Sequence, residues 1–537
     1  MESVSRLIIS AKDFIPPAQD WTPQSESLSA SDSADIRGQI IEILTNEDLS
    51  SVEQRTEVAL AVVRALASRG RFYFHADSRD FDTCMYFDGQ RKLLERIRSN
   101  SFVAWLSDWL RVNRADALFK FIISAVETAA LSGPHTTAIL PEAFWASRPG
   151  AIYLSNGDGA AVKITAGGLQ TVDNGADGVL FTAGRTLAPW TLTKPEDPFV
   201  TCSIFRNAHC NAGHGPDLLR LWLYSLPTNP RSKPPLCPAG DVGSGKTRTA
   251  KAISELCGLP FIAQKVEDDA ENQFWPSIDQ GGVFTLDNAD TRCRWLADAL
   301  ANAATDGCTQ RRKLYTNSET VILRARAWII VTTANPTFAS DAGLADRLLV
   351  VRMGRRTEET SDALLTDEIL AARDGALSHI AETLSKALAD TTPIPAGLNQ
   401  RHPDFGAFAV RIGRAVGREA ECIAALKAAE LDKAAFCLEN DALGCALVAF
   451  MRGRKLWQGT AAELLEALKE VDPDMAAIRD NGKPEWSAKR VSKRLSALWP
   501  HLEKGFTPCQ KATEAHSKTV RFTFGSAGFA GIESTIP

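Results

Sequence analysis

The spacing of apolar residues changes several times along this chain, and the first change comes after residue 35. Residues 17–35 read PAQDWTPQSESLSASDSAD, which is rich in serine and acidic residues and nearly free of large apolar side chains. Because such a segment can bury little apolar surface, we expect residues 1–35 to form a disordered lead-in. From 36 to 68 the apolar residues recur at the spacing of amphipathic helices, and this pattern predicts two helices.

Short strands are expected next. The runs RFYFHA at 71–76 and TCMYFD at 83–88 are rich in aromatic residues and predict a pair of strands. A helical pattern returns over 90–131, and the residues at 137–195 form short β-like runs separated by glycine. We therefore interpret residues 36–230 as one mixed α+β domain, helical first and strand-rich later.

The second half of the chain starts with a turn-rich linker, NPRSKPP at 229–235. Apolar runs that suit buried strands follow it, then a long helical pattern, and finally a segment that looks like a separate small domain. The expected division is a lead-in (1–35), an N-terminal collar or docking domain (36–230), an α/β domain (231–362), a helical segment (363–450) and a C-terminal domain (451–537).

Composition narrows the class of protein. Of the 537 residues, 45% are hydrophobic and 23% are charged, which is ordinary for a soluble globular protein. No apolar run approaches the roughly 18 residues of a membrane-spanning helix. The start, MESVSRLIIS, lacks the basic and apolar regions of a signal peptide. We expect a cytoplasmic protein that has no membrane partner.

The 11 cysteines include no CxxC pair and are expected to be reduced thiols. Four residues of zinc-ligand type lie close together in the chain: Cys202, His209, Cys210 and His214. Two of them are adjacent, and their spacing fits no structural zinc pattern. The sequence leaves two interpretations open, a metal site or ordinary buried and loop residues.

One segment matches a phosphate-binding pattern at every fixed position. GDVGSGKT at 240–247 fits GxxxxGK[ST], in which glycines let the backbone curl so that successive N–H groups face phosphates. The helix expected after it would present the positive end of its dipole to the same anions. Lys246 is expected to reach the β- and γ-phosphates of ATP, and Thr247 to ligate magnesium. The expected nucleotide-binding residues are Gly240, Asp241, Val242, Gly243, Ser244, Gly245, Lys246 and Thr247.

The strand before this loop departs from the usual clean apolar run. It reads PPLCPAG, and Pro238 near its end lacks the N–H that a central strand would donate. We expect a short strand in front of an intact loop.

A second strand supplies a carboxylate. VFTLD at 283–287 is hydrophobic and ends 41 residues after Lys246, a distance that suits a strand of the same sheet. Asp287 is expected to hold magnesium through water. Asn288 stands where many related ATPases have a glutamate that orients the attacking water, and Asp290 is the candidate for that role. The alternative for Asp290 is a cap of the helix that follows.

Two further residues follow a third buried strand, AWIIV at 327–331. Asn335 is expected beside the γ-phosphate, where a polar strand tip can sense it; the alternative is a turn before Pro336. Arg347 precedes another apolar run and is expected to reach the ATP site of a neighbouring subunit, where it would stabilise transition-state charge. The alternative for Arg347 is a surface ion pair. The expected catalytic residues are Lys246, Asp287, Asn288, Asp290, Asn335 and Arg347.

These segments, in this order, resemble the superfamily 3 helicases of the AAA+ class, and in particular the phage, plasmid and genomic-island replication ATPases related to poxvirus primase-helicases. The likeness rests on GDVGSGKT (240–247), GGVFTLDN (281–288), RRKLYTNSE (311–319), TTANPTF (332–338), LADRLLVV (344–351) and LWQGTAAELLEAL (456–468). It covers residues 200–537 well and the earlier part loosely. Pro238 is atypical of this family, and Asn288 is typical.

The resemblance implies an α/β fold with an AAA+ P-loop ATPase core, a mixed α+β N-terminal domain, a helical segment and a C-terminal winged helix. It also implies a hexameric homo-oligomer that uses ATP and Mg²⁺. In superfamily 3 rings, a hairpin at the place of residues 311–319 grips single-stranded DNA in the central channel, and positive charge with an aromatic residue suits such a grip. Phosphate contacts are expected from Arg311, Arg312 and Lys313, while Tyr315 either joins them or packs inside. The alternative is a solvated basic hairpin.

The C-terminal segment is basic, although the whole chain has a net charge of −5. Nine basic and three acidic residues lie between 483 and 521, as a module that binds a phosphate backbone requires. A helix at 459–470, a second at 487–498 and a strand at 518–524 would together make a winged helix. DNA contacts are expected from the second helix, at Lys489, Arg490, Lys493 and Arg494. The alternative is a winged helix that contacts protein.

Two hypotheses follow. The first is a hexameric DNA helicase that acts on single-stranded and forked DNA in the replication of a phage or mobile element, with a primase or loading factor as a candidate partner. The second is an ATP-switched initiator, regulator or defence protein that binds DNA and hydrolyses ATP without unwinding. A third, a protein-remodelling AAA+ enzyme, is disfavoured by the charge of the hairpin and of the C-terminal module.

Overall fold

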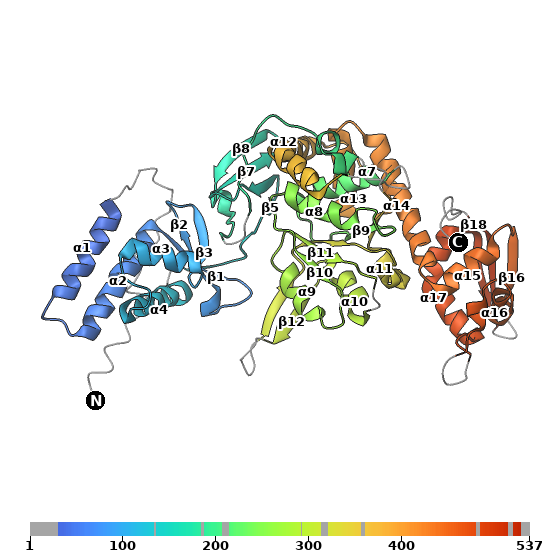
Figure 1. Ribbon diagram of the computed structural model, residues 1–537, viewed down its shortest axis with the longest axis horizontal. Helices are drawn as coiled ribbons and strands as arrows, with labels where there is room; N and C mark the ends of the chain where they lie inside the picture. The colour runs from blue at the N-terminus through green and yellow to red at the C-terminus, as the bar shows by residue number, and fades with distance from the viewer. Residues whose placement is uncertain are drawn as a thin grey trace.

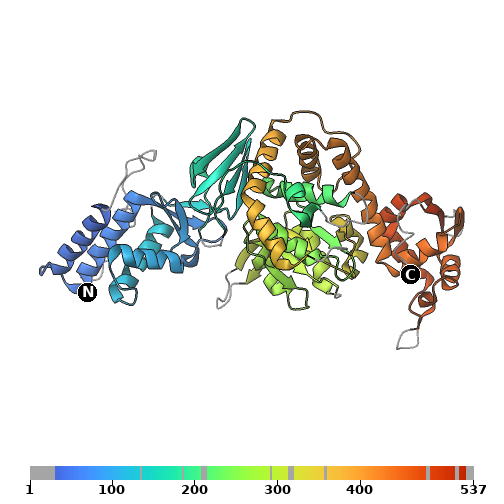
Figure 2. The same cartoon turned by 45° about the horizontal axis from the view of Figure 1, so that its top comes forward.

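A computed structural model of the chain describes residues 31–133, 136–183, 187–206, 214–290, 293–312, 320–355, 360–478, 484–513 and 519–527. These residues form three lobes in a row, with the N-terminal lobe at one end and the C-terminal lobe at the other (Figures 1 and 2). Helices and strands occur in all three lobes, so the protein has a mixed α/β fold.

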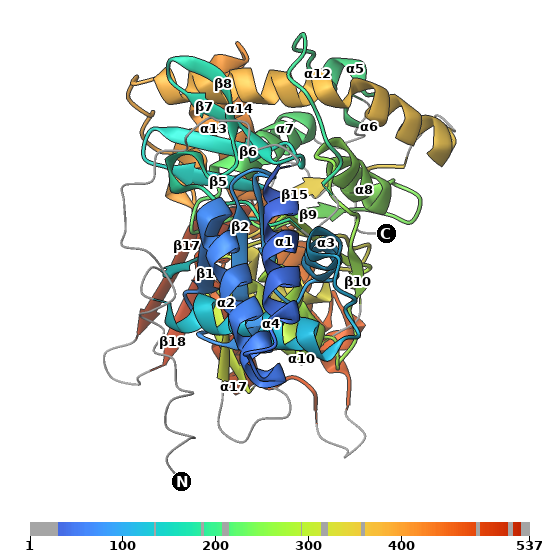
Figure 3. The same ribbon diagram turned by 90° about the vertical axis from the view of Figure 1, so that its left-hand side faces the viewer.

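The N-terminal lobe packs four helices against a small sheet of order β3-β2-β1-β4. Its helices are α1 (Ser31–Thr45), α2 (Ser51–Arg69), α3 (Asn100–Leu110) and α4 (Ala117–Ser132), and its strands are β1 (Gly70–His75), β2 (Cys84–Asp88), β3 (Leu93–Arg96) and β4 (Thr137–Ile139). Helix α2 starts at a capping box, in which Ser50 and Glu53 satisfy each other's backbone N–H groups. Figure 3, seen from this lobe, shows α1 and α2 lying side by side.

The strands expected at 71–76 and 83–88 are present and pair antiparallel as β1 and β2. Two other expectations differ. The helical pattern at 90–131 begins with strand β3, whose LLER sequence also fits a short strand paired with β2. Most of the expected lead-in lies outside the described residues, but α1 already begins at Ser31, so residues 31–35 are helical.

An antiparallel meander connects the N-terminal lobe to the central lobe. Its strands are β5 (Trp145–Arg148), β6 (Ala151–Ser155), β7 (Ala160–Thr165) and β8 (Gly168–Asp173), in that spatial order. After it come three helices, α5 (Pro198–Thr201), α6 (Ser203–Arg206) and α7 (Gly215–Ser225). Apolar residues of the meander and of α7 belong to the same hydrophobic cluster as residues of the central sheet. The boundary expected at 230/231 therefore does not coincide with a break in the core.

The central sheet has five parallel strands in the order β10-β11-β14-β9-β15. They are β9 (Leu236–Ala239), β10 (Ala263–Lys265), β11 (Val283–Asp287), β14 (Trp328–Val331) and β15 (Leu349–Arg352). Side chains of β14 alternate between two hydrophobic clusters, with Trp328 and Ile330 in one and Ile329 and Val331 in the other. Helices therefore cover both faces, as a parallel sheet requires.

The helices on one face include α7, α8 (Lys246–Leu256), α12 (Asp362–Ala389) and α13 (Pro403–Ala415); those on the other include α9 (Glu271–Ile278), α10 (Arg294–Ala303) and α11 (Ala342–Ala345). A separate hairpin of β12 (Cys308–Arg312) and β13 (Thr320–Arg324) projects from this lobe (Figure 1). Helix α14 (Glu419–Glu439) leads toward the C-terminal lobe.

The C-terminal lobe combines three helices with an antiparallel sheet of order β16-β18-β17. Its elements are α15 (Ala442–Met451), β16 (Leu456–Thr460), α16 (Ala461–Lys469), α17 (Ala488–Gly505), β17 (Phe506–Thr513) and β18 (Val520–Ala527). Leu447 and Phe450 of α15 lie in one hydrophobic cluster with α16, α17 and the sheet. The core of this lobe thus starts before the boundary expected at 450/451.

Among the described residues, no single helix is long and apolar enough to cross a bilayer. Helices α14 and α15 reach that length and composition only as a pair, and the pair is bent by 106°.

Candidate functional site

Most of the nucleotide-binding and catalytic residues expected from the sequence lie at the carboxyl ends of the central strands. Strand β9 lies between β14 and β15, although both of these come later in the chain. The chain leaves β9 through the loop at 240–245, enters α8, and places β10 and β11 on the far side of β14. Such a change of direction opens a crevice at the carboxyl edge of a parallel sheet, which is where ligands bind in open α/β folds.

Pro238 lies in the middle of this sheet. On one side, Pro238 is paired with Val351 of β15. On the other side, toward β14, strand β9 is paired at Leu236 and Ala239, which lie on either side of the proline. The carbonyl of Pro238 still accepts a 3.2 Å hydrogen bond from Thr333. The missing N–H is thus tolerated because the strand is short, as the sequence suggested.

The loop after β9 has the backbone that its glycines allow. Gly243 and Gly245 have φ values of 84° and 82°, in the left-handed region that favours glycine. Gly240 has an ordinary φ but no room, because a Cβ there would lie 1.9 Å from the carbonyl oxygen of Met353. Gly240 is therefore required by close packing against the end of β15, and the other two by conformation.

Lys246 begins helix α8 and folds back over the loop. Its Nζ donates to the carbonyl oxygens of Gly240 and Asp241 at 2.6 and 2.7 Å. Burial lowers the pKa of Lys246, and the carboxylates of Asp290, Asp241 and Asp287 oppose that shift. The ammonium group is thus held at the mouth of the loop by acceptors that a bound anion could replace.

Thr247 and Asp287 meet directly. The hydroxyl of Thr247 donates to Asp287 Oδ1 at 2.7 Å, so the end of β11 and the start of α8 are within one hydrogen bond of each other. The same Oδ1 also accepts from Thr332 Oγ1 at 2.7 Å. Thr332 is fully buried and fixes the carboxylate from the tip of β14. A hydroxyl and a carboxylate oxygen side by side are ligand types that Mg²⁺ prefers.

Asp290 holds the tip of β14 and does not cap the next helix. Its Oδ1 accepts from Thr333 Oγ1 at 2.7 Å and from the backbone N–H groups of Ala334 and Asn335 at 2.7 and 2.8 Å. Burial raises the pKa of Asp290, but these three bonds outweigh it and lower the pKa below its usual value. The cap position of α10 is Cys293, so the helix-cap alternative is not what the structure has.

Asn288 and Asn335 are both exposed beside these carboxylates. Asn288 has a φ of 59°, a left-handed conformation that asparagine tolerates, and its N–H donates to Thr332 Oγ1 at 3.0 Å. The structure thus brings Lys246, Thr247, Asp287, Asn288, Asp290 and Asn335 to one edge of the sheet. The sequence analysis did not assign a role to Thr332 and Thr333, which hold Asp287 and Asp290. Their position, as two hydroxyl residues directly after a buried strand, could have indicated this role.

Arg347 lies apart from this group, between α11 and β15. Its Nη1 donates to the carbonyl of Gly343 within α11, and its Nε is buried without a hydrogen-bond partner among the described residues. The backbone carbonyl of Arg347 lies 3.0 Å from His402 Nε2, and His402 Nδ1 lies 2.6 Å from Ser232 Oγ. The backbone at Arg347 is thus fixed, and its guanidinium makes no ion pair among the described residues.

The basic hairpin is partly described. Strands β12 and β13 pair antiparallel as expected, while Lys313 and Tyr315 lie outside the described residues. Arg311 does not project freely, because it donates to Asn272 Oδ1 at 2.8 Å and forms an ion pair with Glu271 at 3.3 Å. The phosphate contact expected of Arg311 would require this pair to break. Arg312 is exposed.

The basic helix expected in the C-terminal segment is α17. Lys489 and Lys493 are exposed on it. Arg490 is tied to Glu485 at 3.3 Å and stacks over Trp486 at 4.7 Å from the ring centre. Arg494 points the other way, to Asp441 Oδ2 and to the carbonyl of Ser340, both at 2.6 Å. The structure therefore uses Arg494 for an internal contact, and of the four residues expected to bind DNA the two lysines are the exposed ones.

The cysteine–histidine cluster is only half described, because His209 and Cys210 lie outside the described residues. Cys202 is completely buried, and burial raises the pKa of its thiol to about 11. His214 lies at the cap position of α7 without a side-chain capping bond. Within the described ranges, no group of three or more His, Cys, Asp or Glu residues could hold a metal ion.

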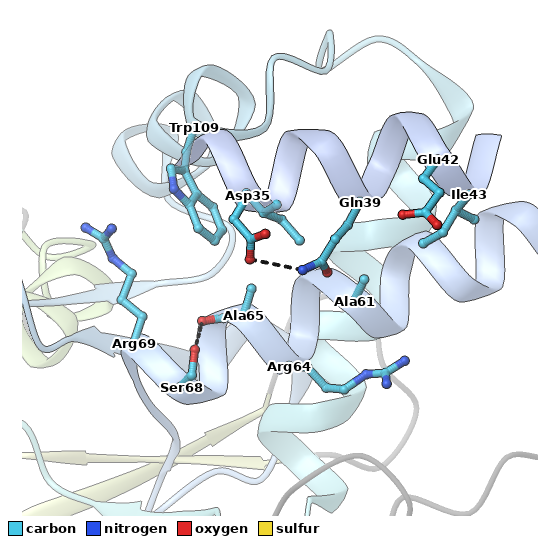
Figure 4. Close-up of a pocket in the computed structure, with 11 residues that line it drawn as sticks. Asp35, Gln39, Glu42, Ile43, Ala61, Arg64, Ala65, Ser68, Arg69 and Trp109 are labelled. Atoms are coloured by element: carbon cyan, nitrogen blue, oxygen red, sulfur yellow. Dashed lines mark hydrogen bonds between the residues drawn. The ribbon is translucent and has the colours of Figure 1, made fainter. Parts of the chain in front are cut away.

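A cavity of about 630 Å³ lies far from these residues, between α1 and α2 of the N-terminal lobe (Figure 4). Charged residues of both signs line it, together with Trp109. Asp35 accepts a 3.0 Å hydrogen bond from Gln39 across one turn of α1. The residues singled out from the sequence at the edge of the central sheet do not line this cavity.

Comparisons with known proteins place one segment in a described family. Residues 443–524 match the model of the AICE RepA C-terminal domain, and this segment covers nearly the whole C-terminal lobe. It thus resembles a domain of mobile-element replication proteins. No curated protein matches the chain.

Two solved structures are similar over most of the chain. The C-terminal region of NrS-1, in its A-form apo structure, is 11% identical and aligns over 86% of this chain and 98% of that chain, with a TM-score of 0.40. SCCmec type IV Cch, described as an active helicase, is 12% identical and aligns over 85% of this chain and 92% of that chain, with a TM-score of 0.42.

Proposed function

We propose that this protein is a magnesium-dependent ATPase that drives DNA unwinding as a ring-shaped homo-oligomer in the replication of a phage or mobile element. The observation that carries the proposal is the 2.7 Å hydrogen bond between Thr247 and Asp287, with Lys246 beside it at the mouth of the glycine loop. Residues that are 40 positions apart in the sequence meet at the edge of the sheet where ligands bind.

The residues present fit a nucleotide and its metal. The loop at 240–245 turns its backbone into the start of α8, where free N–H groups and the helix dipole favour phosphate. Lys246 would exchange its two carbonyl acceptors for phosphate oxygens, and Thr247 and Asp287 would hold Mg²⁺. When bound, the metal neutralises charge that develops on the phosphates.

Asp290 is the residue that we propose to orient the attacking water. Hydrogen bonds lower its pKa, so it is a carboxylate at neutral pH and can accept a proton from water. Its Oδ1 is occupied by Thr333, Ala334 and Asn335, which leaves Oδ2 for that role. Asn335, anchored by the same carboxylate, is the candidate sensor of the γ-phosphate.

Arg347 is proposed to act on the ATP of a neighbouring subunit. Its partly exposed side chain makes no ion pair among the described residues, and its backbone is fixed through His402. An arginine supplied from a neighbour stabilises the charge of the transition state and makes hydrolysis depend on assembly. A hexamer is the ring size that we propose.

DNA contact is proposed at two places. The hairpin of β12 and β13 projects from the central lobe and would grip single-stranded DNA through Arg312, at the end of β12, and Lys313, the next residue in the sequence. In the C-terminal lobe, the three helices and the three-stranded sheet suit a winged helix, with Lys489 and Lys493 on its exposed basic face. The match to the AICE RepA C-terminal domain supports a role in replication.

Measurements of ATP hydrolysis in the presence of single-stranded DNA test the ATPase. Lys246→Ala and Asp287→Asn should each lower kcat by about 100-fold or more, because they remove the phosphate contact and the metal ligand. Lys251→Ala is the matched control: Lys251 lies on the same helix, is half-buried and forms an ion pair with Glu255 at 3.6 Å. ATP hydrolysis that survives both site variants would refute the proposal.

A forked-duplex unwinding assay separates the motor from an ATP-switched DNA-binding protein. Arg312→Ala/Lys313→Ala should abolish unwinding while basal ATP hydrolysis is retained, and Lys386→Ala, an exposed lysine on α12, should leave both unchanged. ATP hydrolysis by the unaltered protein without any unwinding would favour the switch.

A further inference from the structure

The chain between Asn335 and Arg347 links the two proposed nucleotide-sensing residues. It runs through Pro336, a 3₁₀ turn at Thr337–Ser340, the capping residue Asp341 and helix α11. We call residues 335–347 the connecting segment. Its first end is fixed by Asp290, which accepts from the N–H of Asn335, and its last residue precedes β15.

The C-terminal lobe holds the middle of the connecting segment through α17. Arg494 Nη2 donates to the carbonyl of Ser340 at 2.6 Å, and Nε donates to Asp441 Oδ2 at 2.6 Å. Asp441 is 6% exposed and its second oxygen caps α15 by accepting from Gly444 at 2.9 Å. The guanidinium therefore joins the end of the 3₁₀ turn to the first helix of the C-terminal lobe.

A second contact lies two turns further along α17. His501 is 2% exposed, and its Nε2 lies 3.1 Å from the carbonyl oxygen of Ala342. Because the acceptor is a carbonyl, Nε2 carries the hydrogen and donates it. Lys504, one turn on, lies 3.7 Å from Asp346, which directly precedes Arg347.

Packing agrees with the hydrogen bonds. Ala345 of α11 is completely buried and belongs to the hydrophobic cluster of the C-terminal lobe, and Ala342 packs against that cluster. The connecting segment joins β14 to β15 along the chain, and α11 packs both in the central core, through Leu344, and in the core of the neighbouring lobe, through Ala345. A displacement of α17 would therefore displace α11 with it.

A neighbouring face of α17 is exposed and basic. Lys489 and Lys493 are four residues apart, share one exposed face and make no ion pair among the described residues. Arg494 and His501 are seven residues apart and share another face, turned toward the connecting segment. One helix thus presents its basic face to solvent and fixes the two proposed sensors with its other face.

From these contacts we infer that Arg494 and His501 are positioning residues that set Arg347 and Asn335 for ATP hydrolysis, so that DNA bound to the C-terminal lobe regulates the ATP site through α17. The inference rests on the proposed function, because it assigns a regulator to the same site. His501 is not among the residues that we propose to contact nucleotide or DNA, and Arg494, which the sequence suggested as a DNA contact, is engaged in the internal contact instead. Their effect passes through the backbone carbonyls of Ser340 and Ala342.

Steady-state ATP hydrolysis by the full-length protein, with and without an oligothymidine strand, tests the inference. His501→Leu and Arg494→Ala should each lower the DNA-stimulated kcat by about 10- to 100-fold, because small displacements of a catalytic group have effects of that size. The KM for ATP should stay within about twofold, since Lys246 and Thr247 are untouched. His501→Gln and Arg494→Lys keep a donor and should restore most of kcat.

Three comparisons keep the outcome unambiguous. Lys469→Ala removes a half-exposed lysine of the same lobe that pairs with Glu466 on α16, and should change nothing. In an Arg347→Ala background, His501→Leu should cause no further loss of kcat, whereas general destabilisation would add to it. Equal kcat for His501→Leu, Arg494→Ala and the unaltered protein, with a reduced but measurable kcat for Arg347→Ala, overturns the inference alone. An Arg347→Ala variant with the kcat of the unaltered protein overturns the proposed role of Arg347 as well.

Discussion

Arg324, at the end of strand β13, forms a two-pronged ion pair with Asp77 of the N-terminal lobe. Arg324 Nε lies 2.7 Å from Asp77 Oδ2, and Nη2 lies 2.6 Å from Oδ1. The backbone N–H of Arg324 also donates a hydrogen bond to Asp279 at 2.8 Å, so its main chain is held in place as well. A residue at the base of the proposed DNA hairpin therefore forms an ion pair with a residue of the N-terminal lobe that lies almost 250 positions earlier in the sequence.

A double-mutant cycle of Asp77→Ala and Arg324→Ala should give a coupling free energy of about 0.5–1 kcal/mol, modest because the guanidinium is partly exposed. The hydrogen bonds from Arg324 lower the pKa of Asp77 below 3.8, against the effect of burial. The ion pair thus stabilises the fold at pH values above 3.8, and this contribution is lost as the pH falls through the lowered value. Urea unfolding measures the coupling, and strict additivity of the two variants would contradict it.

Two glycines of the phosphate loop should respond differently to alanine. Gly240→Ala would force a methyl group to 1.9 Å from the Met353 carbonyl, so it should lower stability by about 2–3 kcal/mol and abolish ATP binding. Gly243 has open space around it and only an unfavourable φ of 84°, so Gly243→Ala should cost about 1 kcal/mol. Thermal unfolding and binding of a fluorescent ATP analogue give both quantities. Equal losses would mean that close packing against β15 is not what requires Gly240.

Asp290→Asn separates a chemical role of this residue from a structural one. The amide oxygen can still accept from Ala334 and Asn335, so folding and ATP binding should persist. A neutral amide cannot take a proton from water, so kcat should fall by about 100-fold or more. Single-turnover hydrolysis measures the chemical step directly. A kcat within a few fold of the unaltered protein would reduce Asp290 to an anchor of the strand tip.

Lys233 should make stability depend on pH above neutrality. It is 7% exposed, donates to the carbonyl of Arg326 at 2.7 Å, and burial lowers its pKa to about 7; Asp306 and Glu142 oppose that shift, and Arg326 adds to it. Between pH 7 and 10.5 the unfolded chain binds a proton that the folded protein does not, so stability should rise with pH in this window.

Lys233→Met keeps the length of the side chain and removes the titrating group. Relative to this variant, the unaltered protein should gain up to about 1.4 kcal/mol per pH unit within the window. The midpoint and slope of urea unfolding at about pH 7.5 and at about pH 9.5 give the difference. Parallel pH dependence of the two proteins would show that Lys233 remains charged when folded.

The local chemistry of the site could be predicted from the sequence, because it depends on neighbouring residues. Glycines, lysine and threonine within 240–247 define a loop and a helix start without reference to the rest of the chain, and a buried strand ending in Asp287 follows from periodicity alone. Strands β1 and β2 and the β12–β13 hairpin were predicted for the same reason. The proposed roles of these residues remain predictions.

Only the tertiary structure decided which side chains serve as partners. Arg311 and Arg494 look equivalent to any exposed basic residue in the sequence, yet Glu271 and Asp441 engage them. The partner of Arg494 on the connecting segment is a backbone carbonyl, Ser340, 154 residues away, and no residue type signals such an acceptor.

The periodicity of apolar residues also does not predict how the hydrophobic core is divided among the lobes. A pattern of apolar residues predicts that a helix has a buried face, but not what covers that face. Helix α7 packs with the central sheet and not with the N-terminal lobe, and α11, which lies between two central strands in the sequence, packs in the core of the C-terminal lobe as well as in the central core. Which lobe a helix packs in depends on how well surfaces from distant parts of the chain fit together. The conformation of the phosphate loop, in contrast, is determined by eight consecutive residues.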